Sequence, residues 1–197
     1  MRDWDELYQK IGPLRYQAST SDCVPTTIIN GLAVLLGEQL HPKLNQLIWA
    51  LAGDQDKHGG TGWVCCDTLA VLLSKWFKRA HQDGRAKEEL PFTSEIIEGK
   101  SVDLDRKGKL LRCIHGGGVA CLVTGTNADH YSLLIDVEGD TFIGFDSFWK
   151  GKKTVKRLEA FASYNGIINI RWTRDELEKT LQEGGWVHLL GNRPSTT

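Results

Sequence analysis

The chain of 197 residues is long enough for one sizeable domain with a substantial hydrophobic core. Its 24 Lys and Arg residues nearly balance 25 Asp and Glu residues, and this balance argues against a nucleic-acid or membrane surface as a partner. The longest apolar runs are far too short to span a bilayer. The charged N-terminus carries no secretory signal, so we expect a cytoplasmic protein, with secretion by another route left open.

The first half of the chain has the apolar spacing of helices. We expect a helix over 23–36 that stops at Gly37, a second that opens at Pro42 and ends at Gly53, and a third over 61–80. Residues 81–90 are polar and suit a surface loop. The inward faces of the second and third helices are expected to carry Leu44, Leu47, Ile48 and Leu51, and Leu69, Leu72, Leu73 and Trp76, respectively.

The second half changes to the periodicity of strands. The segment 118–125 is apolar on both faces, which is typical of a central strand. Two further segments flank the turn signal "EGD" and predict a hairpin over 130–137 and 141–149. Additional strands are expected at 166–172 and 185–191, with a short helix between them that starts from a capping box of Thr173 and Glu176.

Helices followed by an antiparallel sheet predict an α+β fold with a cleft between the two parts. We expect a single domain over 1–197, with a helical lobe over about 1–90 and a sheet lobe over about 91–197.

Cysteine usage indicates free thiols in a reducing compartment. The number of cysteines is odd, and no C-x-x-C pair is present, so neither a disulfide framework nor a zinc site is expected. The five residues are Cys23, Cys65, Cys66, Cys113 and Cys121.

Cys23 is unusual because the sequence places it in the first turn of the predicted helix over 23–36. The N–H groups at a helix N-terminus and the helix dipole both favour a thiolate there. Pro25 costs little in that turn because a first-turn N–H has no intrahelical acceptor to lose. The stretch therefore suits a rigid helix start with a thiol at its tip.

A catalytic thiol needs a base and a group that orients the base. The best candidate for the base is His130, at the start of an apolar strand, and Asp146 follows sixteen residues later across the predicted hairpin. The amide of Gln17 and the backbone N–H of Cys23 are candidate donors to an oxyanion.

These four residues resemble the pattern of the papain-like cysteine peptidase superfamily, and most closely that of the peptidase C39 and C39-like family. The family pattern "Q-x4-D-C-G-x-T/A" is matched by Gln17, Asp22, Cys23 and Thr26, and the later "H-strand, then D-P" pattern by "HYSLLIDV" and "GFDSF". The resemblance spans about 15–150. It implies a papain-like fold in which Cys23 is the nucleophile, His130 the base, Asp146 the orienting group and Gln17 the oxyanion donor.

The chain departs from that pattern at two positions. Val24 stands where the family has glycine, which is expected to narrow the space beside the thiol. Ser147 stands where the family has proline, although papain itself resembles "N-S-W" there. Phe148 or Trp149 is expected to shield the His–Asp hydrogen bond from water. No transporter segment is visible, which argues against an exporter-linked leader peptidase.

The hairpin has to satisfy a condition of parity, because strand side chains alternate between faces. A two-residue turn without a bulge would set Leu133 opposite Asp146 and leave His130 on the wrong face. An odd-length connection, or a bulge before Asp146, would set Ser132 opposite Asp146 and bring His130 to the same face. We therefore predict one of these two irregularities.

The remaining candidates have simpler interpretations. Cys65, Cys66, Cys113 and Cys121 are expected to be packing residues, and His41, His58, His81 and His188 surface or structural residues. The "HGGG" stretch at His115 suits a turn into a strand, because neither a helix nor a lysine follows it as in a phosphate-binding loop. Trp63 and Trp149 are candidates for lining the cleft. The basic run over 150–157 is expected to be a solvated surface.

The sequence therefore predicts a cysteine peptidase that cleaves a peptide or isopeptide bond in a peptide or protein substrate, with no cofactor and no metal. Two alternatives stay open. A papain-like acyltransferase would pass the acyl group to an amine, and a non-catalytic binding protein would keep only the scaffold. The sequence does not specify the oligomeric state.

Overall fold

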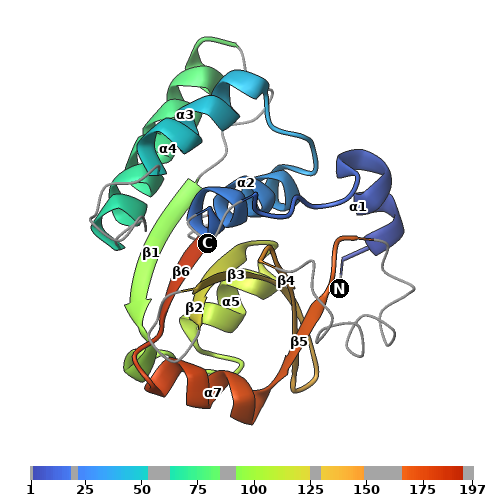
Figure 1. The fold of residues 1–197 in the computed structure, drawn as a ribbon, viewed down its shortest axis with the longest axis vertical. Helices are drawn as coiled ribbons and strands as arrows, with labels where there is room; N and C mark the ends of the chain where they lie inside the picture. Colours follow the sequence, from blue (N-terminus) through green and yellow to red (C-terminus); the bar gives the residue numbers. More distant parts are fainter. Residues whose placement is uncertain are drawn as a thin grey trace.

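The computed structural model describes residues 2–18, 22–52, 63–84, 92–124, 130–148 and 166–192, and the chain has an α+β fold (Figure 1). The helices are α1 (Trp4–Ile11), α2 (Cys23–Leu36), α3 (Pro42–Ala52), α4 (Trp63–Gln82), α5 (Lys109–His115) and α7 (Arg174–Gln182), with a 3-10 turn η1 (Gly99–Ser101). The strands are β1 (Phe92–Glu98), β2 (Val119–Thr124), β3 (His130–Glu138), β4 (Thr141–Asp146), β5 (Ile170–Thr173) and β6 (Trp186–Asn192). None of the helices in these ranges is long and apolar enough to cross a membrane.

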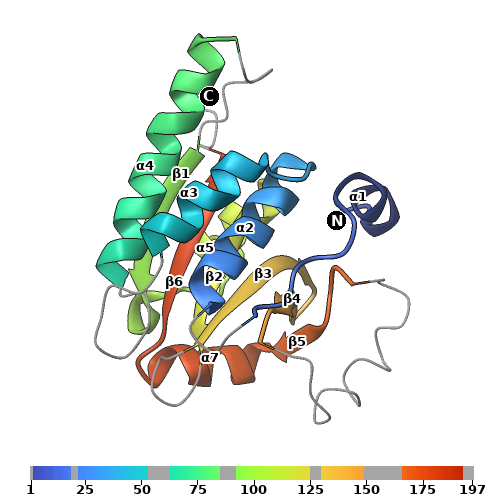
Figure 2. The same ribbon diagram turned by 45° about the horizontal axis from the view of Figure 1, so that its top comes forward.

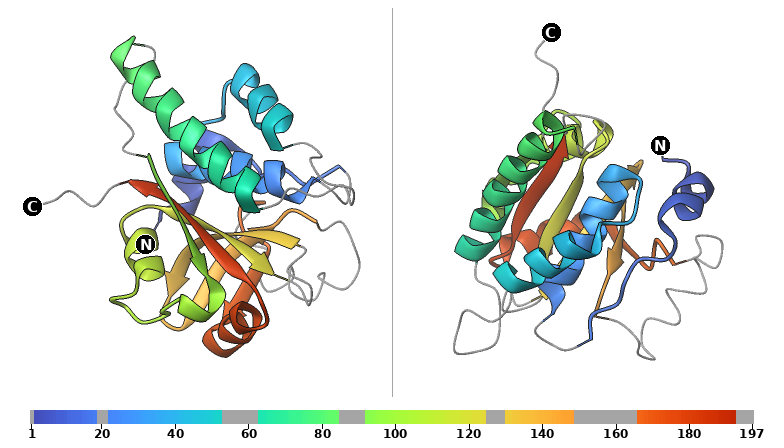
Figure 3. Two further views of the ribbon diagram at one scale, coloured as in Figure 1. Left: turned by 90° about the vertical axis from the view of Figure 1, so that its left-hand side faces the viewer. Right: turned by 90° about the horizontal axis from the view of Figure 1, so that it is seen from above.

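The strands form one antiparallel sheet in the order β1-β6-β2-β3-β4-β5. The last strand in the sequence, β6, is inserted between β1, which is at the edge of the sheet, and β2 (Figure 1). The strands cross at an angle when the sheet is seen along its edge (Figure 3), as expected from the usual twist of strands. The central position of β2 confirms the prediction made from its apolar character on both faces.

Each face of the sheet carries its own hydrophobic core. The side chains of Val119, Cys121 and Val123 in β2 pack into the core beneath α2, while those of Ala120 and Leu122 pack into the core beneath α5 and α7. Helices α2, α3 and α4 therefore lie on one side of the sheet, with α5 and α7 on the other (Figure 2). This alternation explains why β2 has no polar face.

Helix α2 is the central helix of the fold, and its residues 23–34 are all buried. Gly31 allows it to lie close to the sheet, because a Cβ at this position would be 3.2 Å from the Leu133 side chain and 3.4 Å from that of Val119. The helix ends at Gly37, which adopts the left-handed conformation that glycine tolerates best. The close contact with β2 and β3 fixes the start of α2 relative to the sheet.

The predicted second and third helices are confirmed as α3 and α4, but their predicted inner faces are partly wrong. Leu47 and Leu72 are exposed, at 39% and 40%. The buried stripes are narrower than the apolar stripes in the sequence, since Leu51 and Trp76 are only partly buried where they pack against the core. Among the hydrophobic side chains that the structure describes, the buried ones are Leu44, Ile48 and Ala52 in α3, and Leu69, Leu73 and Ala80 in α4.

The predictions for the remaining strands differ in outcome. The hairpin and the last strand are confirmed, and the capping box of Thr173 and Glu176 starts α7 as expected. The predicted strand over 166–172 is wrong in its first half, since only Ile170–Thr173 pairs with β4. Residues 166–169 instead make contacts that support the candidate site. The predicted loop over 81–90 begins as the end of α4 and a turn, and 85–90 lie outside the described residues.

Candidate active site

Cys23 is the first residue of α2, as the sequence predicted. Its neighbour Asp22 precedes the helix and accepts the first intrahelical hydrogen bond through its carbonyl oxygen, 3.1 Å from the Thr26 nitrogen. Pro25 lies within the first turn, where no backbone donor is required. The cysteine is 9% exposed, so the thiol lies at the margin of the core rather than deep inside it.

The β3–β4 hairpin contains the irregularity that the parity condition required. A two-residue turn pairs Glu138 with Thr141, and the register then shifts between Leu134 and Asp136. Beyond this bulge Ser132 lies opposite Asp146. The predicted bulge is therefore confirmed, while the odd-length connection is not what the chain uses.

Arg2 and two residues of the hairpin hold this bulge. Ile135 is the extra residue, and its carbonyl oxygen accepts a hydrogen bond from the Arg2 guanidinium at 3.3 Å. The Asp136 carboxylate accepts hydrogen bonds from the Val137 nitrogen at 2.8 Å and the Arg2 backbone nitrogen at 3.2 Å. Gly144 lies opposite the bulge, and a Cβ there would collide with the Leu133 carbonyl oxygen. The carbonyl oxygen that the bulge leaves without a partner on β4 is thus satisfied by a side chain from the other end of the chain.

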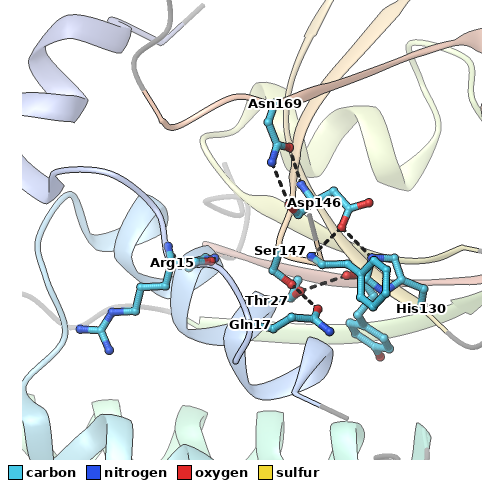
Figure 4. Close-up of polar contacts among 10 residues, drawn as sticks. Arg15, Gln17, Thr27, His130, Asp146, Ser147 and Asn169 are labelled. Carbon is cyan, nitrogen blue, oxygen red and sulfur yellow. Dashed lines mark hydrogen bonds and ion pairs between the residues drawn. The ribbon is translucent and has the colours of Figure 1, made fainter. Parts of the chain in front are cut away.

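The bulge brings His130 and Asp146 into direct contact. The His130 Nε2 lies 2.7 Å from Asp146 Oδ1, and the same carboxylate oxygen accepts a hydrogen bond from the Phe148 nitrogen at 2.9 Å (Figure 4). The Phe148 ring meets the imidazole edge-on, with ring centroids 5.5 Å apart, although half of the Phe148 surface stays exposed. The carboxylate therefore has the position of a group that orients the imidazole.

The His130 imidazole also contacts the Cys23 side chain. Burial alone would lower the pKa of His130, but hydrogen bonds with Asp146 and with Cys23 outweigh burial and raise that pKa to about 9. Because Nε2 faces Asp146, the other ring nitrogen, Nδ1, is the one available to the thiol. The imidazole lies between a sulfur and a carboxylate, and this favours its charged form at neutral pH.

A hydrogen bond links α2 and β3 directly behind this pair. Thr27, one turn after Cys23, donates its hydroxyl to the carbonyl oxygen of Tyr131 at 3.2 Å. Tyr131 is buried, and its ring packs edge-on against Trp186 with centroids 5.1 Å apart. The helix and the strand that carry the thiol and the imidazole are therefore joined at adjacent positions.

Asn169 supports Asp146 from the other side and was not singled out in the sequence. Its side-chain oxygen accepts from the Asp146 nitrogen at 2.6 Å, and its side-chain nitrogen donates to the Asp146 carbonyl oxygen at 2.8 Å. At Asp146, beyond the part of β4 that pairs with β5, the side-chain amide of Asn169 therefore takes the place of a neighbouring strand. An asparagine within the apolar run "GIINIRW" was the available signal in the sequence, because an amide that is buried needs partners, and Asn169 is 2% exposed.

Gln17 lies beside the end of β4, next to Ser147. Its backbone nitrogen donates to the Ser147 carbonyl oxygen at 2.9 Å, and its side-chain oxygen accepts from the Ser147 hydroxyl at 3.0 Å. Figure 4 shows the Gln17 amide nitrogen turned away from Ser147. The structure thus brings all four sequence-predicted residues to one region, where the start of α2 meets the ends of β3 and β4.

The other residues discussed from the sequence fall into separate groups. Val24 is 2% exposed and belongs to the core cluster, so its side chain packs inward. His188 is fully buried, and burial lowers its pKa to about 4. Trp149, His58 and the basic run over 150–157 lie outside the described residues, as do the side chains of Trp63, Cys65 and Cys66.

Cys113 on α5 and Cys121 on β2 are not in disulfides and lie away from the candidate site. Burial raises the pKa of Cys113 to about 11, because little solvent is available to stabilise a thiolate. Cys121 is fully buried in β2, which confirms its prediction as a packing residue. Within the described ranges no group of His, Cys, Asp and Glu side chains could hold a metal ion.

Comparison with known proteins gives a match in structure. No protein-family profile and no curated protein matches the chain. Among solved structures, it is similar to the peptidase domain of Streptococcus ComA, a bi-functional ABC transporter involved in a quorum-sensing pathway. The match has 14% sequence identity and a TM-score of 0.50, and it covers 91% of this chain and 98% of that one. The fold is papain-like. At this identity the papain-like match describes the fold and not the activity.

Proposed function

We propose that the protein is a cysteine-dependent hydrolase that cleaves a peptide or isopeptide bond through an acyl-enzyme. The observation that carries the proposal is the position of the His130 imidazole, which hydrogen-bonds the Asp146 carboxylate and interacts with the Cys23 side chain closely enough for the sulfur to raise the pKa of His130. Nucleophilic catalysis by cysteine requires a thiol next to an imidazole and a carboxylate on the other side of that imidazole. The papain-like fold supports the same assignment.

The chemistry begins with the sulfur of Cys23 as a thiolate. The sulfur attacks the substrate carbonyl carbon, a C–S bond forms, and the carbonyl oxygen becomes an oxyanion within reach of the Gln17 amide and the Cys23 backbone N–H. His130 then gives its proton to the departing amine as the C–N bond breaks. Water, deprotonated by His130, attacks the thioester, and the acid leaves as the C–S bond breaks. Cys23 and His130 return to their starting protonation states.

The raised pKa of His130 supports this first step. An imidazole with a pKa of about 9 is protonated at neutral pH, and its positive charge stabilises a neighbouring thiolate. The Asp146 carboxylate holds the ring through Nε2 and stabilises the imidazolium, so that Nδ1 faces the sulfur. The imidazole is therefore oriented and already protonated before a substrate arrives.

A peptide or protein is the proposed substrate, by analogy with the peptidase domain that shares the fold. Neither a nucleic acid nor a membrane is expected as a partner, because the formal net charge is −1. Acyl transfer to an amine uses the same acyl-enzyme and differs only in the second nucleophile. Product analysis with and without an added amine separates the two: aminolysis that outruns hydrolysis would assign a transferase.

The test is selective alkylation of Cys23 with iodoacetamide at pH 6, followed by mass spectrometry. We expect Cys23 to react at least about tenfold faster than the other thiols, because only a thiolate is a good nucleophile. Cys113 is an internal control, since its raised pKa keeps it protonated at that pH.

The variant His130→Ala should abolish the advantage of Cys23 at pH 6 while leaving the slow labelling of Cys113 unchanged. If wild-type Cys23 reacts no faster than the other four thiols, the hydrolase proposal is wrong and a binding role on the same scaffold replaces it. Equal labelling of wild type and His130→Ala would have the same consequence, because the imidazole would then have no effect on the sulfur.

A further inference from the structure

We propose that Ser147 is a positioning residue for the oxyanion donor: its hydroxyl holds the Gln17 side-chain oxygen and so fixes the direction of the amide nitrogen that donates to the carbonyl oxygen of the substrate. The inference rests on the proposed function and adds a residue to it. Ser147 follows Asp146 directly in the chain, so two consecutive residues would serve the two halves of the site.

The contact between Ser147 and Gln17 is double. The backbone nitrogen of Gln17 donates to the Ser147 carbonyl oxygen at 2.9 Å, and the Ser147 hydroxyl donates to the Gln17 side-chain oxygen at 3.0 Å. A glutamine amide has one accepting and one donating end, so satisfying the oxygen determines where the NH₂ group points. In Figure 4 this group is turned away from Ser147.

Ser147 is well placed to hold another side chain because it is itself fixed. It is 1% exposed, and the residue before it is held on both backbone groups by the amide of Asn169. The residue after it, Phe148, donates its backbone nitrogen to the Asp146 carboxylate. A buried hydroxyl with fixed neighbours has little freedom to choose another acceptor.

The Gln17 backbone is fixed in a similar way from the helical side. The side chain of Asn30 in α2 accepts from the Arg15 nitrogen and donates to the Arg15 carbonyl oxygen, both at 2.9 Å. The rings of Tyr16 and Phe145 pack with centroids 5.1 Å apart. With the backbone held, the Ser147 hydroxyl restricts the rotatable bonds of the Gln17 side chain before a substrate binds.

This arrangement separates two chemical demands. Asp146 acts on the imidazole and hence on the thiolate, while Ser147 acts on the donor that stabilises an oxyanion. Alkylation by iodoacetamide needs the thiolate but creates no oxyanion. Acylation by p-nitrophenyl acetate needs both, because its transition state is tetrahedral and negatively charged on oxygen. Loss of the Ser147 hydroxyl should therefore slow one reaction and spare the other.

The experiment measures both rates at Cys23 in wild type and in Ser147→Ala. We expect about tenfold slower acylation by p-nitrophenyl acetate, somewhat less than the roughly 10²–10³-fold loss typical of removing an oxyanion donor outright. The rate and pH profile of iodoacetamide alkylation should stay within about twofold of wild type. Ser101→Ala, on the exposed 3-10 turn η1, is the matched control and should change neither rate.

A double-mutant cycle with Gln17 tests whether Ser147 acts through that residue. In the background of Gln17→Ala, adding Ser147→Ala should cause no further loss of acylation, because the side chain to be positioned is gone. Gln17→Glu retains an oxygen that accepts from Ser147 but removes the amide donor, and it should be as slow as Gln17→Ala. Ser147→Thr, which retains the hydroxyl, should restore most of the acylation rate.

Two results would overturn the inference while leaving the hydrolase proposal intact. One is an acylation rate in Ser147→Ala equal to that of wild type. The other is additive losses in the double variant, which would mean that Ser147 acts independently of Gln17. Failure of the hydrolase proposal gives a different pattern, because wild-type Cys23 would then show no preferential alkylation at pH 6 and no dependence on His130.

Discussion

The two sides of the site are built by different means. On the helical side, Cys23 is placed by local structure: it starts a helix whose limits are set by neighbouring residues within a few positions. On the sheet side, His130 and Asp146 share a face because the hairpin between them bulges out one residue, Ile135, whose carbonyl oxygen is held by Arg2 from the far end of the chain. The first arrangement depends on sequence neighbours and the second on tertiary contacts.

The difference indicates where each half can fail. A change near Cys23 alters one helix start, whereas a change in the hairpin alters the face on which a whole strand presents its side chains. Both sides use the same solution to hold their backbone, since Asn30 clamps Arg15 and Asn169 clamps Asp146 through both ends of a side-chain amide. Because one asparagine supports each side, substituting Asn30 or Asn169 tests the two sides separately.

The largest effect is expected from Gly144→Ala, opposite the bulge. A Cβ there would collide with the Leu133 carbonyl oxygen and lie 2.7 Å from the Trp172 ring. We expect the free energy of unfolding to fall by about 3 kcal/mol, measured by urea denaturation, together with loss of preferential alkylation of Cys23. Gly139→Ala, in the turn of the same hairpin, has open space around it and should cost only about 1 kcal/mol for its positive φ. Equal losses in the two variants would contradict the importance of the bulge.

An intermediate effect is expected from removing either clamp. Asn30→Ala and Asn169→Ala should each lower the free energy of unfolding by about 2 kcal/mol, because backbone groups lose their partners. Only Asn169→Ala should reduce the alkylation of Cys23 at pH 6, whereas Asn30→Ala should mainly slow acylation by p-nitrophenyl acetate.

The matched control for the two clamps is Asn45→Ala, a buried asparagine of α3 that lies away from the site. It should leave both rates at Cys23 unchanged, whatever its effect on stability. If Asn30→Ala and Asn169→Ala impair alkylation and acylation alike, the helical and the sheet side of the site do not act separately.

The smallest effect is expected in the dependence of stability on pH. The folded pKa of His130 is about 9, above its ordinary value of 6.5, so the folded state binds the proton more tightly than the unfolded state. The resulting stabilisation is complete below pH 6.5 and is lost as pH rises through about 9. His188, whose pKa is lowered to about 4, is neutral in the folded state throughout this window, and its partial protonation in the unfolded state near pH 6.5 contributes with the opposite sign, at the lower end of the window alone.

We therefore expect the free energy of unfolding to decline between pH 6.5 and pH 9, and we expect this decline to be reduced in His130→Ala. Urea denaturation at three pH values within the window measures it. A slope that is the same in wild type and variant would show that His130 is not the group responsible.

Much of the helical side could be predicted from the sequence because its determinants are local. The apolar spacing after Cys23 and the glycine at position 37 were sufficient to give the limits of α2. The exposure of Leu47 and Leu72 could not be predicted in this way, because an apolar stripe in a sequence does not specify how wide the contact will be.

On the sheet side, the sequence predicted only what the hairpin must do to bring His130 and Asp146 to one face, and not how it does so. Parity required an odd connection or a bulge, and the choice between them depends on contacts of Arg2 with Ile135 and Asp136, more than a hundred residues away. The roles of Asn169 and Ser147 were missed for the same reason, since a side-chain amide or hydroxyl has no periodicity that identifies its partner. The helices α1 and α5 and the strand β1 were missed because they are short or weakly patterned.

The bulge at Ile135 also determines which changes in length the hairpin tolerates. Deleting one residue between Leu133 and Val137 would remove the extra residue, and with it the bulge, and would leave a regular hairpin in which Ser132 still lies opposite Asp146 and His130 keeps its face. Deleting two residues would keep His130 on the face of Asp146 only if a bulge remained in the shortened strand. Chains that retain the pairing of His130 with Asp146 should therefore combine a one-residue shortening of this hairpin with loss of the bulge, and a two-residue change with its retention.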